Sequence, residues 1–347
     1  MPQKPTLAIV VPAFNEAQGL PELHRRLSEA VAGLDLAVSM LFVDDGSRDD
    51  TFAVIESLHL ADPRVGGLRL SRNFGKELAL TAGLDHVDAD AVVVIDADLQ
   101  DPPELIPDMV ARWRDGVDVV YGQRVAREGE GWFKRASAAA FYRIIGRLSH
   151  TPIPRDTGDF RLMSRRAHQA LGRLRERHRF MKGLFAWVGF RQEALAYRRQ
   201  PRHQGHSKWG WWRLWNLAVE GITSFSGAPL RMATPLGLAA ALGAFSYGAI
   251  IIAKTLIWGD PVPGYPSLMV VIRFLGGIQL MALGVMGEYL GRLYEEVKQR
   301  PLYLVECHLA PGTEAVAADA QRYDGDAHST QVPDHADSQP AARRKGA

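Results

Sequence analysis

Two aspartates in the segment DADLQDPPE have a spacing that suits cation binding. Asp96 and Asp98 close the apolar run AVVVI, and alternate side chains of an extended segment point the same way. Two converging carboxylates repel each other unless a cation lies between them or the pKa of one rises. Mg²⁺ and Mn²⁺ prefer oxygen ligands and bridge the oxygens of a diphosphate. The pair therefore predicts a metal site that binds a nucleotide diphosphate.

Three further polar segments follow apolar runs in the same way. They are PAFNE (Pro12 to Glu16), DDGSRDDT (Asp44 to Thr51) and SRNFGKELA (Ser71 to Ala79). Any one of them alone could be ordinary turn or helix-capping chemistry. In open α/β sheets, however, ligands bind beyond the carboxyl ends of the strands. All four segments together therefore predict one shared site.

The elements that must position this site alternate between residue 5 and about residue 160. Leucines, an alanine and a valine recur at helical spacing from Leu20 to Leu34, between the first two apolar runs. The runs are nearly continuous, as expected for parallel strands covered on both faces: TLAIVV, VSMLFV, GGLRLS, AVVVID and DVVYG. Strand and helix alternation of this kind predicts a doubly wound, mostly parallel α/β sheet.

Two common phosphate-binding patterns are missing from the sequence. It contains no GxxxxGK[ST], which speaks against a P-loop, and no GxGxxG follows the first run, which speaks against a dinucleotide fold. The remaining common use of a metal-bound diphosphate is as a leaving group. A nucleotide-sugar is therefore the expected substrate.

The second half of the chain contains two long apolar segments. Met232 to Ala253 holds no charged residue and as a helix would reach about 33 Å, enough to cross a bilayer core. Leu268 to Tyr289 is a weaker segment, interrupted by Arg273 and closed by Glu288. We expect a two-helix transmembrane hairpin, and a buried hairpin of a soluble protein is the alternative.

The charges around these segments predict their orientation. The loop from Gly259 to Ser267 has no Lys or Arg, whereas basic residues flank the outer ends: Arg231, Arg292, Lys298 and Arg300. The positive-inside rule then places both termini in the cytoplasm. The N-terminus has too short an apolar run for a secretory signal, and the single Cys307 permits no internal disulfide. Both features suit a cytoplasmic catalytic domain.

A basic and aromatic region precedes the first apolar segment. Between Arg161 and Arg213 there are fourteen Lys or Arg and two acidic residues. The segment GHSKWGWWRLWN (Gly205 to Asn216) lies at the end of this region. Its tryptophans suit a short interfacial helix, with a core aromatic cluster as the alternative. RFMKGLFAWVGF (Arg179 to Phe190) is typical of an amphipathic helix beside the acceptor entry or of a plain packing helix. Residues after Pro311 have the composition of a disordered tail.

Several segments in this order resemble one family: VVPAFNE, FVDDGSRDDT, RNFGKELAL, DADLQDPPE, GQR, DTGDFRLM and GHSKW. Together with the final GEYLGRLYEEVKQRP they are similar to glycosyltransferase family 2, which has the GT-A fold, and to its polyisoprenyl-phosphate branch. The resemblance covers about residues 5 to 305. It implies a GT-A catalytic domain followed by interfacial amphipathic helices and two transmembrane helices.

The resemblance also implies roles for individual residues. The donor nucleotide would be bound by Pro12, Ala13, Asn15, Glu16, Asp44, Asp45, Arg72, Lys76, Asp96 and Gln100. The metal, Mg²⁺ or Mn²⁺, would be bound by Asp96 and Asp98. Phosphates would be bound by Arg124, Arg135, Arg202, Ser207 and Lys208. The catalytic set would be Asp98, Arg124 and Asp159, with Asp156 as a nearby rival and Arg161 as a partner that keeps Asp159 charged. Gln123 of GQR, where many relatives have Ser or Thr, is left without a role.

The expected reaction is attack of a lipid phosphate oxygen on the anomeric carbon of a nucleotide-sugar, with inversion. UDP-glucose is the first choice of donor and undecaprenyl phosphate of acceptor; UDP-N-acetylglucosamine, GDP-mannose and aminoarabinose donors stay open. The expected location is the bacterial cytoplasmic membrane, with a homo-oligomer and a flippase partner also open and nucleic acid not a partner. The expected ranges are 1–205 catalytic, 206–231 interfacial, 232–292 transmembrane, 293–310 juxtamembrane and 311–347 disordered.

Three other functions fit the sequence less well. A processive polysaccharide synthase usually carries QxxRW, which is missing here. A non-catalytic nucleotide-sugar-binding scaffold for a flippase predicts decay of the metal and phosphate residues, yet all are intact. Single-stranded nucleic acid could stack on the tryptophans, but their place directly before an apolar helix favours lipid.

Overall fold

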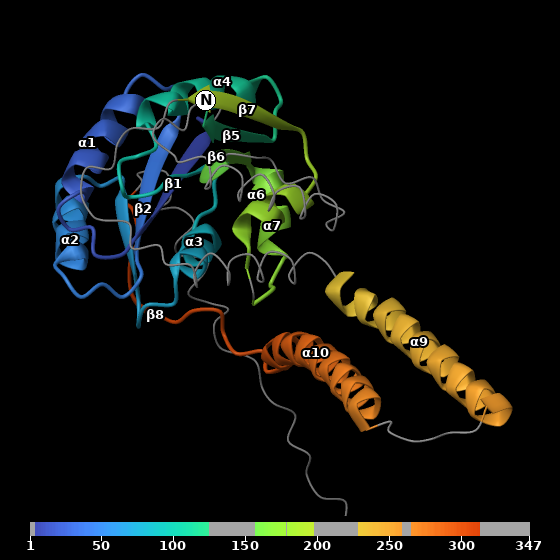
Figure 1. Cartoon of the computed structure of the whole chain (residues 1–347). Helices are drawn as coiled ribbons and strands as arrows, with labels where there is room; N and C mark the ends of the chain where they lie inside the picture. Colours follow the sequence, from blue (N-terminus) through green and yellow to red (C-terminus); the bar gives the residue numbers. More distant parts are fainter. Residues whose placement is uncertain (1–3, 125–156, 178, 198–227, 259–264, 313–347) are drawn as a thin grey trace, which may run out of the picture. The chain divides into compact units, whose positions relative to one another are not determined.

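An eight-stranded sheet lies at the centre of the fold. The computed structural model describes residues 4–124, 157–177, 179–197, 228–258 and 265–312. The strands follow the order β7-β5-β6-β4-β1-β2-β3-β8 across the sheet (Figure 1). Neighbours in this order are often distant in the sequence, so crossover connections are required, as in other doubly wound sheets.

The five predicted strands are confirmed. They are β1 (Thr6–Ala13), β2 (Ala37–Asp44), β3 (Val65–Leu70), β4 (Ala91–Val94) and β5 (Val119–Arg124). The pairs β1–β2, β2–β3 and β1–β4 are parallel. An antiparallel strand separates β4 from β5, so all five run in the same direction. Their carboxyl ends, with the polar segments that follow, therefore meet at one edge of the sheet.

Three strands were not predicted: β6 (Thr157–Ser164), β7 (Gln192–Tyr197) and β8 (Val305–Leu309). β6 lies between β4 and β5 and is antiparallel to both, whereas β7 extends the sheet parallel to β5. β8 pairs antiparallel with β3 at the other edge, within the range expected to be a juxtamembrane segment. The sheet is therefore mostly parallel, with two antiparallel strands.

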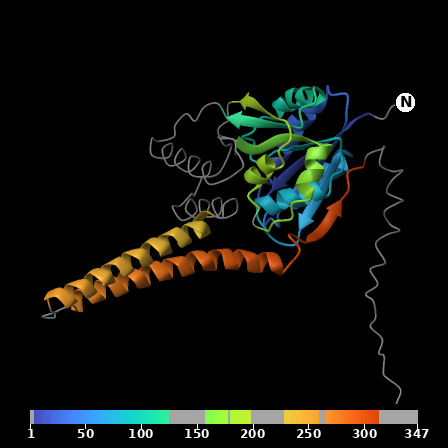
Figure 2. The same ribbon diagram turned by 90° about the vertical axis from the view of Figure 1, so that its right-hand side faces the viewer.

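Helices cover both faces of the sheet (Figure 1, Figure 2). One core contains side chains of α1 (Leu20–Val31), α2 (Thr51–Ala61) and α4 (Ile106–Arg114), which follows a 3₁₀ turn at Pro103–Leu105. The other contains side chains of α3 (Lys76–Asp85), α6 (Arg165–Gly172) and α7 (Met181–Trp187). In α1, Leu20, Leu23 and Leu27 are fully buried at helical spacing, as predicted. Apolar burial on both faces explains the continuous hydrophobic runs.

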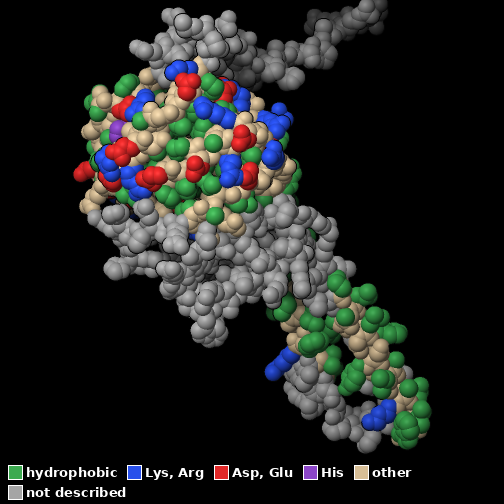
Figure 3. Space-filling view, turned by 90° about the horizontal axis from the view of Figure 1, so that it is seen from above, with side chains coloured by type: hydrophobic (Ala, Val, Ile, Leu, Met, Phe, Trp, Pro, Cys, Tyr) green, Lys and Arg blue, Asp and Glu red, His purple; other side chains and the backbone are tan. Residues whose placement is uncertain are grey.

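Two long helices follow, α9 (Ala228–Trp258) and α10 (Tyr265–Val297), and they contact each other. Among the described residues, one stretch, Val271–Val297 in α10, is long and apolar enough to cross a membrane by length and composition. The first predicted span is helical, but it does not meet that test. Apolar side chains cover the helices (Figure 3), with Phe245 77% and Leu280 72% exposed. Such surface needs an apolar environment or further partners.

Candidate active site

The loops after β1 and β2 are joined by hydrogen bonds. The backbone N–H of Asn15 donates to Ser47 Oγ at 2.9 Å, and Asn15 Oδ1 accepts the N–H of Arg48 at 2.9 Å. The N–H of Glu16 donates to Thr51 Oγ1 at 3.0 Å. Asn15 has φ 54°, a left-handed conformation that Asn tolerates better than most residues. The two polar segments therefore form one continuous rim at the carboxyl edge.

Asp45 joins the β2 loop to the loop after β3. Its carboxylate accepts the N–H groups of Phe74 at 2.7 Å and Gly75 at 2.9 Å. Burial raises the pKa of Asp45, and these two hydrogen bonds oppose that rise. Gly46 has φ 63°, and a Cβ there would lie 2.4 Å from the carbonyl carbon of Arg72, so only glycine fits. Asp45 and Gly46 thereby fix the backbone that carries Lys76.

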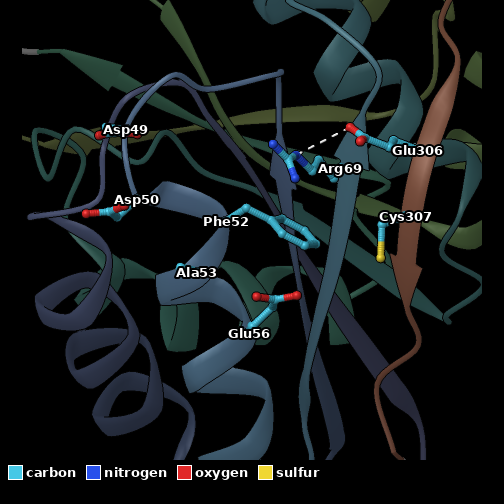
Figure 4. Close-up of a pocket in the computed structure, with 8 residues that line it drawn as sticks. All are labelled: Asp49, Asp50, Phe52, Ala53, Glu56, Arg69, Glu306 and Cys307. Atoms are coloured by element: carbon cyan, nitrogen blue, oxygen red, sulfur yellow. Dashed lines mark ion pairs between the residues drawn. The ribbon is translucent and has the colours of Figure 1, made fainter.

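Asp44 lies at the same edge and is fully buried. Its Oδ1 accepts the N–H of Ser47 at 3.0 Å, and its Oδ2 lies 3.7 Å from Arg69 Nε. Arg69 Nε also lies 3.4 Å from Glu306 Oε2 of β8 (Figure 4). Arg69 and Glu306 line a surface pocket of about 350 Å³ together with Phe52, Cys307 and several acidic residues of α2 and its preceding loop. Arg69 therefore links a predicted donor residue to the strand that follows α10.

Lys76 contacts two of the predicted catalytic and metal-binding carboxylates. Its Nζ lies 2.7 Å from Asp96 Oδ2 and 2.5 Å from Asp159 Oδ2. Asp96 follows β4 and Asp159 lies in β6, and the two strands are adjacent, with Val94 opposite Arg161. The structure thus brings together residues that are far apart in the sequence. Burial alone would lower the pKa of Lys76, but the two carboxylates raise it above its ordinary value.

The carboxylates of this cluster have different pKa values. Burial raises the pKa of Asp96 to about 6, although Lys76 opposes it. Burial would also raise the pKa of Asp159, but Lys76 holds it below its usual range. The neighbouring Glu77 has a pKa raised to about 8, first by burial and then by the charge of Asp159. Of these three carboxylates, Asp159 is the one whose pKa is lowered.

Arg161 contacts the β6 backbone rather than the carboxylate of Asp159. Its guanidinium donates to the carbonyl oxygens of Gly158 at 2.8 Å and Asp159 at 3.2 Å, and it stacks over Phe185 at 3.5 Å. Burial lowers the pKa of Arg161 to about 10. Its charge still favours ionised Asp159, but Lys76 makes the direct contact. Arg161 mainly holds the β6 backbone in place.

The DADLQ turn carries both aspartates that are predicted to bind metal. Asp98 Oδ1 accepts the N–H of Gln100 at 3.2 Å, and the buried Leu99 between them has φ 57°, an unusual conformation for leucine. Asp96 Oδ1 is buried without a hydrogen-bond partner, a free oxygen of the kind that a cation would satisfy. Within the described ranges, no three His, Cys, Asp or Glu side chains group as a metal site.

Arg124 ends β5 and is held by two neighbours. Its Nε donates to Tyr197 Oη at 3.3 Å, and its Nη2 lies 3.8 Å from Asp101 Oδ1. Tyr197 in turn donates a short hydrogen bond to Asp101. A Cβ on Gly158 would lie 2.8 Å from Arg124 Nη2, so the guanidinium packs against bare backbone. These contacts fix the direction of a cation that the sequence predicts to bind phosphate.

The remaining predicted residues divide into two groups. Pro12 and Ala13 end β1, Gln100 is buried, and Arg72 lies at the surface over the Phe74 ring. Arg135, Arg202, Ser207, Lys208 and Asp156 lie outside the described residues, as does the tryptophan-rich segment. Four residues near the site were not predicted: Glu77, Asp101, Lys182 and Tyr197. Glu77, Asp101 and Lys182 stand in segments singled out from the sequence, whereas nothing marked Tyr197.

Two family models match the chain, one over the sheet region and one over the two long helices. Residues 8–172 match the model of glycosyl transferase family 2, and residues 228–293 match the GtrB C-terminal hairpin. The chain is 52% identical to an uncharacterized glycosyltransferase of Synechocystis sp., over 86% of this chain and 94% of that protein. It is 47% identical to the SfII prophage-derived bactoprenol glucosyl transferase of Shigella flexneri, over 86% and 97%.

Solved structures give more distant similarities. Mannosyl-3-phosphoglycerate synthase from Rubrobacter xylanophilus is 18% identical, with a TM-score of 0.43 over 75% of this chain and 79% of that chain. Glucosyl-3-phosphoglycerate synthase from Mycobacterium tuberculosis is 19% identical, with a TM-score of 0.41 over 63% and 79%. The family model and the sequence relatives carry the assignment. The chain is a glycosyltransferase that belongs to glycosyltransferase family 2.

Proposed function

We propose that the chain transfers glucose from UDP-glucose to the phosphate of undecaprenyl phosphate, with inversion at the anomeric carbon. The observation that carries this proposal is the contact of Lys76 with Asp96 and Asp159, because it joins the DxD aspartate to the predicted catalytic carboxylate. The relatives named bactoprenol glucosyl transferase support both the glucosyl group and a polyprenyl-phosphate acceptor. The sheet would be the core of a GT-A catalytic domain.

Asp96 and Asp98 would hold Mg²⁺ or Mn²⁺, with Gln100 beside them. When bound, the ion stabilises the negative charge that grows on the departing diphosphate. The free Oδ1 of Asp96 supports this role. The nucleotide would lie along the loops after β1, β2 and β3, where the predicted donor residues gather: Pro12, Ala13, Asn15, Glu16, Asp44, Asp45, Arg72 and Lys76.

Arg124 would bind phosphate oxygens close to the reacting centre. Tyr197 and Asp101 hold its guanidinium before substrate arrives, which lowers the cost of orienting it in the transition state. Lys182 on α7 adds a half-buried cation: burial lowers its pKa, and the charge of Asp159 opposes that change. The chain therefore presents positive charge to two anionic substrates that would otherwise repel each other. Arg135, Arg202, Ser207 and Lys208 would add to it.

Asp159 would orient groups rather than remove a proton. The acceptor phosphate is already largely ionised at neutral pH, because its second pKa is about 6. Its oxygen therefore needs little help from a general base. Asp159 is tied at 2.5 Å to Lys76, and this contact fixes the direction of a cation within the site. The carboxylate would thus serve by holding Lys76 and the metal-binding edge in position.

The helical region would place this chemistry at the membrane. We propose that α9 and α10 form the transmembrane hairpin of a bacterial cytoplasmic membrane protein, with both termini on the cytoplasmic side. One apolar stretch in α10 and the match to the GtrB C-terminal hairpin support this. The tryptophan-rich segment would lie at the membrane surface, where a lipid phosphate is found. A homo-oligomer and a flippase would be further partners.

The proposal is tested by incubating the purified full chain with undecaprenyl phosphate, Mg²⁺ or Mn²⁺ and a panel of radiolabelled nucleotide-sugars. We expect a labelled lipid from UDP-glucose. Label from UDP-N-acetylglucosamine, GDP-mannose or an aminoarabinose donor instead would correct the donor. A folded protein that binds UDP yet labels no lipid with any donor would refute the proposed function.

The metal assignment has its own test. Asp98→Asn should abolish lipid labelling while leaving thermal unfolding unchanged, because asparagine keeps the Oδ1 acceptor for the Gln100 N–H and removes only the charge. Asp115→Asn is the matched control, since Asp115 is an exposed carboxylate that follows α4. Equal labelling by wild type and Asp98→Asn would remove Asp98 from the metal site.

A further inference from the structure

The Lys76 ammonium lies between two carboxylates, that of Asp96 after β4 and that of Asp159 in β6. Its ammonium contacts one oxygen of Asp96 and one of Asp159, at 2.7 and 2.5 Å. The second oxygen of each carboxylate, Oδ1 in both, is buried and has no hydrogen-bond partner. Both acids therefore have one oxygen neutralised by Lys76 and one still unsatisfied. This is a cation site that the chain fills in part with its own side chain.

The backbone of Lys76 is held in place, whereas its side chain can move away from Asp96. Asp45 binds the N–H groups of the two preceding residues, and α3 begins at Lys76 itself. The Lys76 side chain is 45% exposed, and a Cβ on Gly75 would meet no atom within 4 Å. Four methylene groups let the ammonium swing by several ångströms without moving the helix. The contact with Asp96 can thus open at little structural cost.

A divalent cation on Asp96 Oδ1 would lie close to the Lys76 ammonium on Oδ2 of the same carboxylate, so the two cations compete for Asp96. Like charges repel at short range, and the repulsion is weakly screened where the carboxylates are buried. Asp159 lies in a different strand and is not part of the DxD pair, so its contact with Lys76 can persist when the one with Asp96 is lost. Metal binding would therefore break the contact of Lys76 with Asp96 and leave its contact with Asp159.

We propose that Lys76 is an exchangeable counter-ion, which neutralises Asp96 in the donor-free enzyme and gives it up when the metal binds. This inference rests on the proposed function in placing the metal at Asp96 and Asp98. After the exchange the ammonium stays with Asp159. Lys76 thereby keeps the empty site from carrying unbalanced negative charge.

The test measures Mn²⁺ affinity of the full chain in detergent, by electron paramagnetic resonance without nucleotide. Lys76→Met and Lys76→Gln should bind Mn²⁺ at least fivefold more tightly than wild type, because the competing cation is gone. Lys76→Arg keeps the charge and should not tighten binding. Lys4→Met is the control for loss of one lysine charge, since Lys4 pairs with Asp35 on the exposed surface. Thermal unfolding of each variant shows which are folded.

An unchanged or weaker Mn²⁺ affinity in a folded neutral variant would overturn the exchange. Because Met and Gln differ in polarity and shape, two neutral variants guard against the misfolding of one. If Lys4→Met tightens Mn²⁺ as much as Lys76→Met, the effect is one of net charge and the proposal fails. The labelling of undecaprenyl phosphate by wild type is scored separately, so a failure of the proposed function and a failure of the exchange give different results.

Discussion

Gly158→Ala tests whether the position of Arg124 matters to catalysis. Gly158 precedes Asp159 in β6, and its φ does not lie in the left-handed region, so alanine suits the backbone. The added Cβ would lie 2.8 Å from Arg124 Nη2, whereas ordinary contact begins at 3.4 Å. The guanidinium must therefore move by at least 0.6 Å (3.4 minus 2.8), away from its present place beside Tyr197 and Asp101.

The expected loss follows from that displacement. A misplacement of about 1 Å can cost about 100-fold in rate, so 0.6 Å predicts a loss of about tenfold in kcat. Because the far end of a flexible side chain absorbs the clash, the melting temperature should fall by less than about 2 °C, which corresponds to about 1 kcal/mol or less for a domain of this size. The assay is lipid labelling from the active donor at saturating acceptor, with thermal unfolding measured on the same samples.

Gly172→Ala is the matched control, because a Cβ at Gly172 would meet no atom within 4 Å. It should keep full activity. The reasoning is refuted if Gly158→Ala retains wild-type kcat, or if Gly172→Ala loses as much. A large fall in melting temperature for Gly158→Ala would attribute the loss to folding and likewise remove the argument for Arg124.

Two further predictions concern stability. Hydrogen bonds from Arg64 hold the pKa of Asp62 well below its usual range, against the effect of burial. A lowered folded pKa stabilises the protein above the unfolded pKa of about 3.9 and ceases to do so as the pH falls through the folded pKa. Asp62→Asn should therefore reduce the free energy of unfolding by about 1 kcal/mol at pH 7, and urea titrations should show this difference shrinking below about pH 4; a constant difference would contradict it. Tyr303→Phe removes the hydrogen bond from Tyr303 Oη to Asp85 Oδ2 at 2.9 Å and should cost about 1 kcal/mol by the same measurement at pH 7, whereas no change would show that the bond contributes nothing.

The strands that could be predicted from the sequence are those whose burial is evident from their own residues. β1, β2 and β4 are apolar on both faces because helices cover both, and a continuous hydrophobic run records this directly. β6 is different: it is equally buried, yet it carries Asp159 and Arg161. Those charges are tolerated only because distant residues and carbonyl groups satisfy them. Such a strand cannot be recognised from its local composition.

β8 was missed for a related reason. VECHL is short and carries an acid, and its partner β3 lies more than 200 residues earlier in the chain. Gly66 allows the close approach of β8, since a Cβ there would lie 2.9 Å from Leu309 O, and Gly67 allows that of α2, since a Cβ there would lie 2.8 Å from Ile55 Cγ2. The sequence shows two adjacent glycines in β3 but not what they accommodate. Pairing between strands so far apart in the sequence can be recognised only once the fold is known.

The residues of the candidate site likewise divide into those that the sequence could predict and those that it could not. Motif resemblance placed Lys76 among the donor residues, but the direction of its side chain depends on the start of α3 and on Asp45. Residues that lie in quoted segments were within reach of the sequence, among them Asp101 and Glu77. Tyr197 was not, because its role depends on β7 pairing with β5, in which Arg124 lies opposite Tyr197.

The register of the sheet also connects the donor edge to the helical region. Asp44, Arg69 and Cys307 are opposite one another in β2, β3 and β8, and Glu306 precedes Cys307. Arg69 is thus shared between a fully buried carboxylate and one supplied by the strand that follows α10. Since burying an unpaired carboxylate is costly, the position of Arg69 contributes to how Asp44 is held. The chain after α10 is therefore part of the same sheet, because it supplies both an edge strand and a charge that contacts Arg69 beside Asp44.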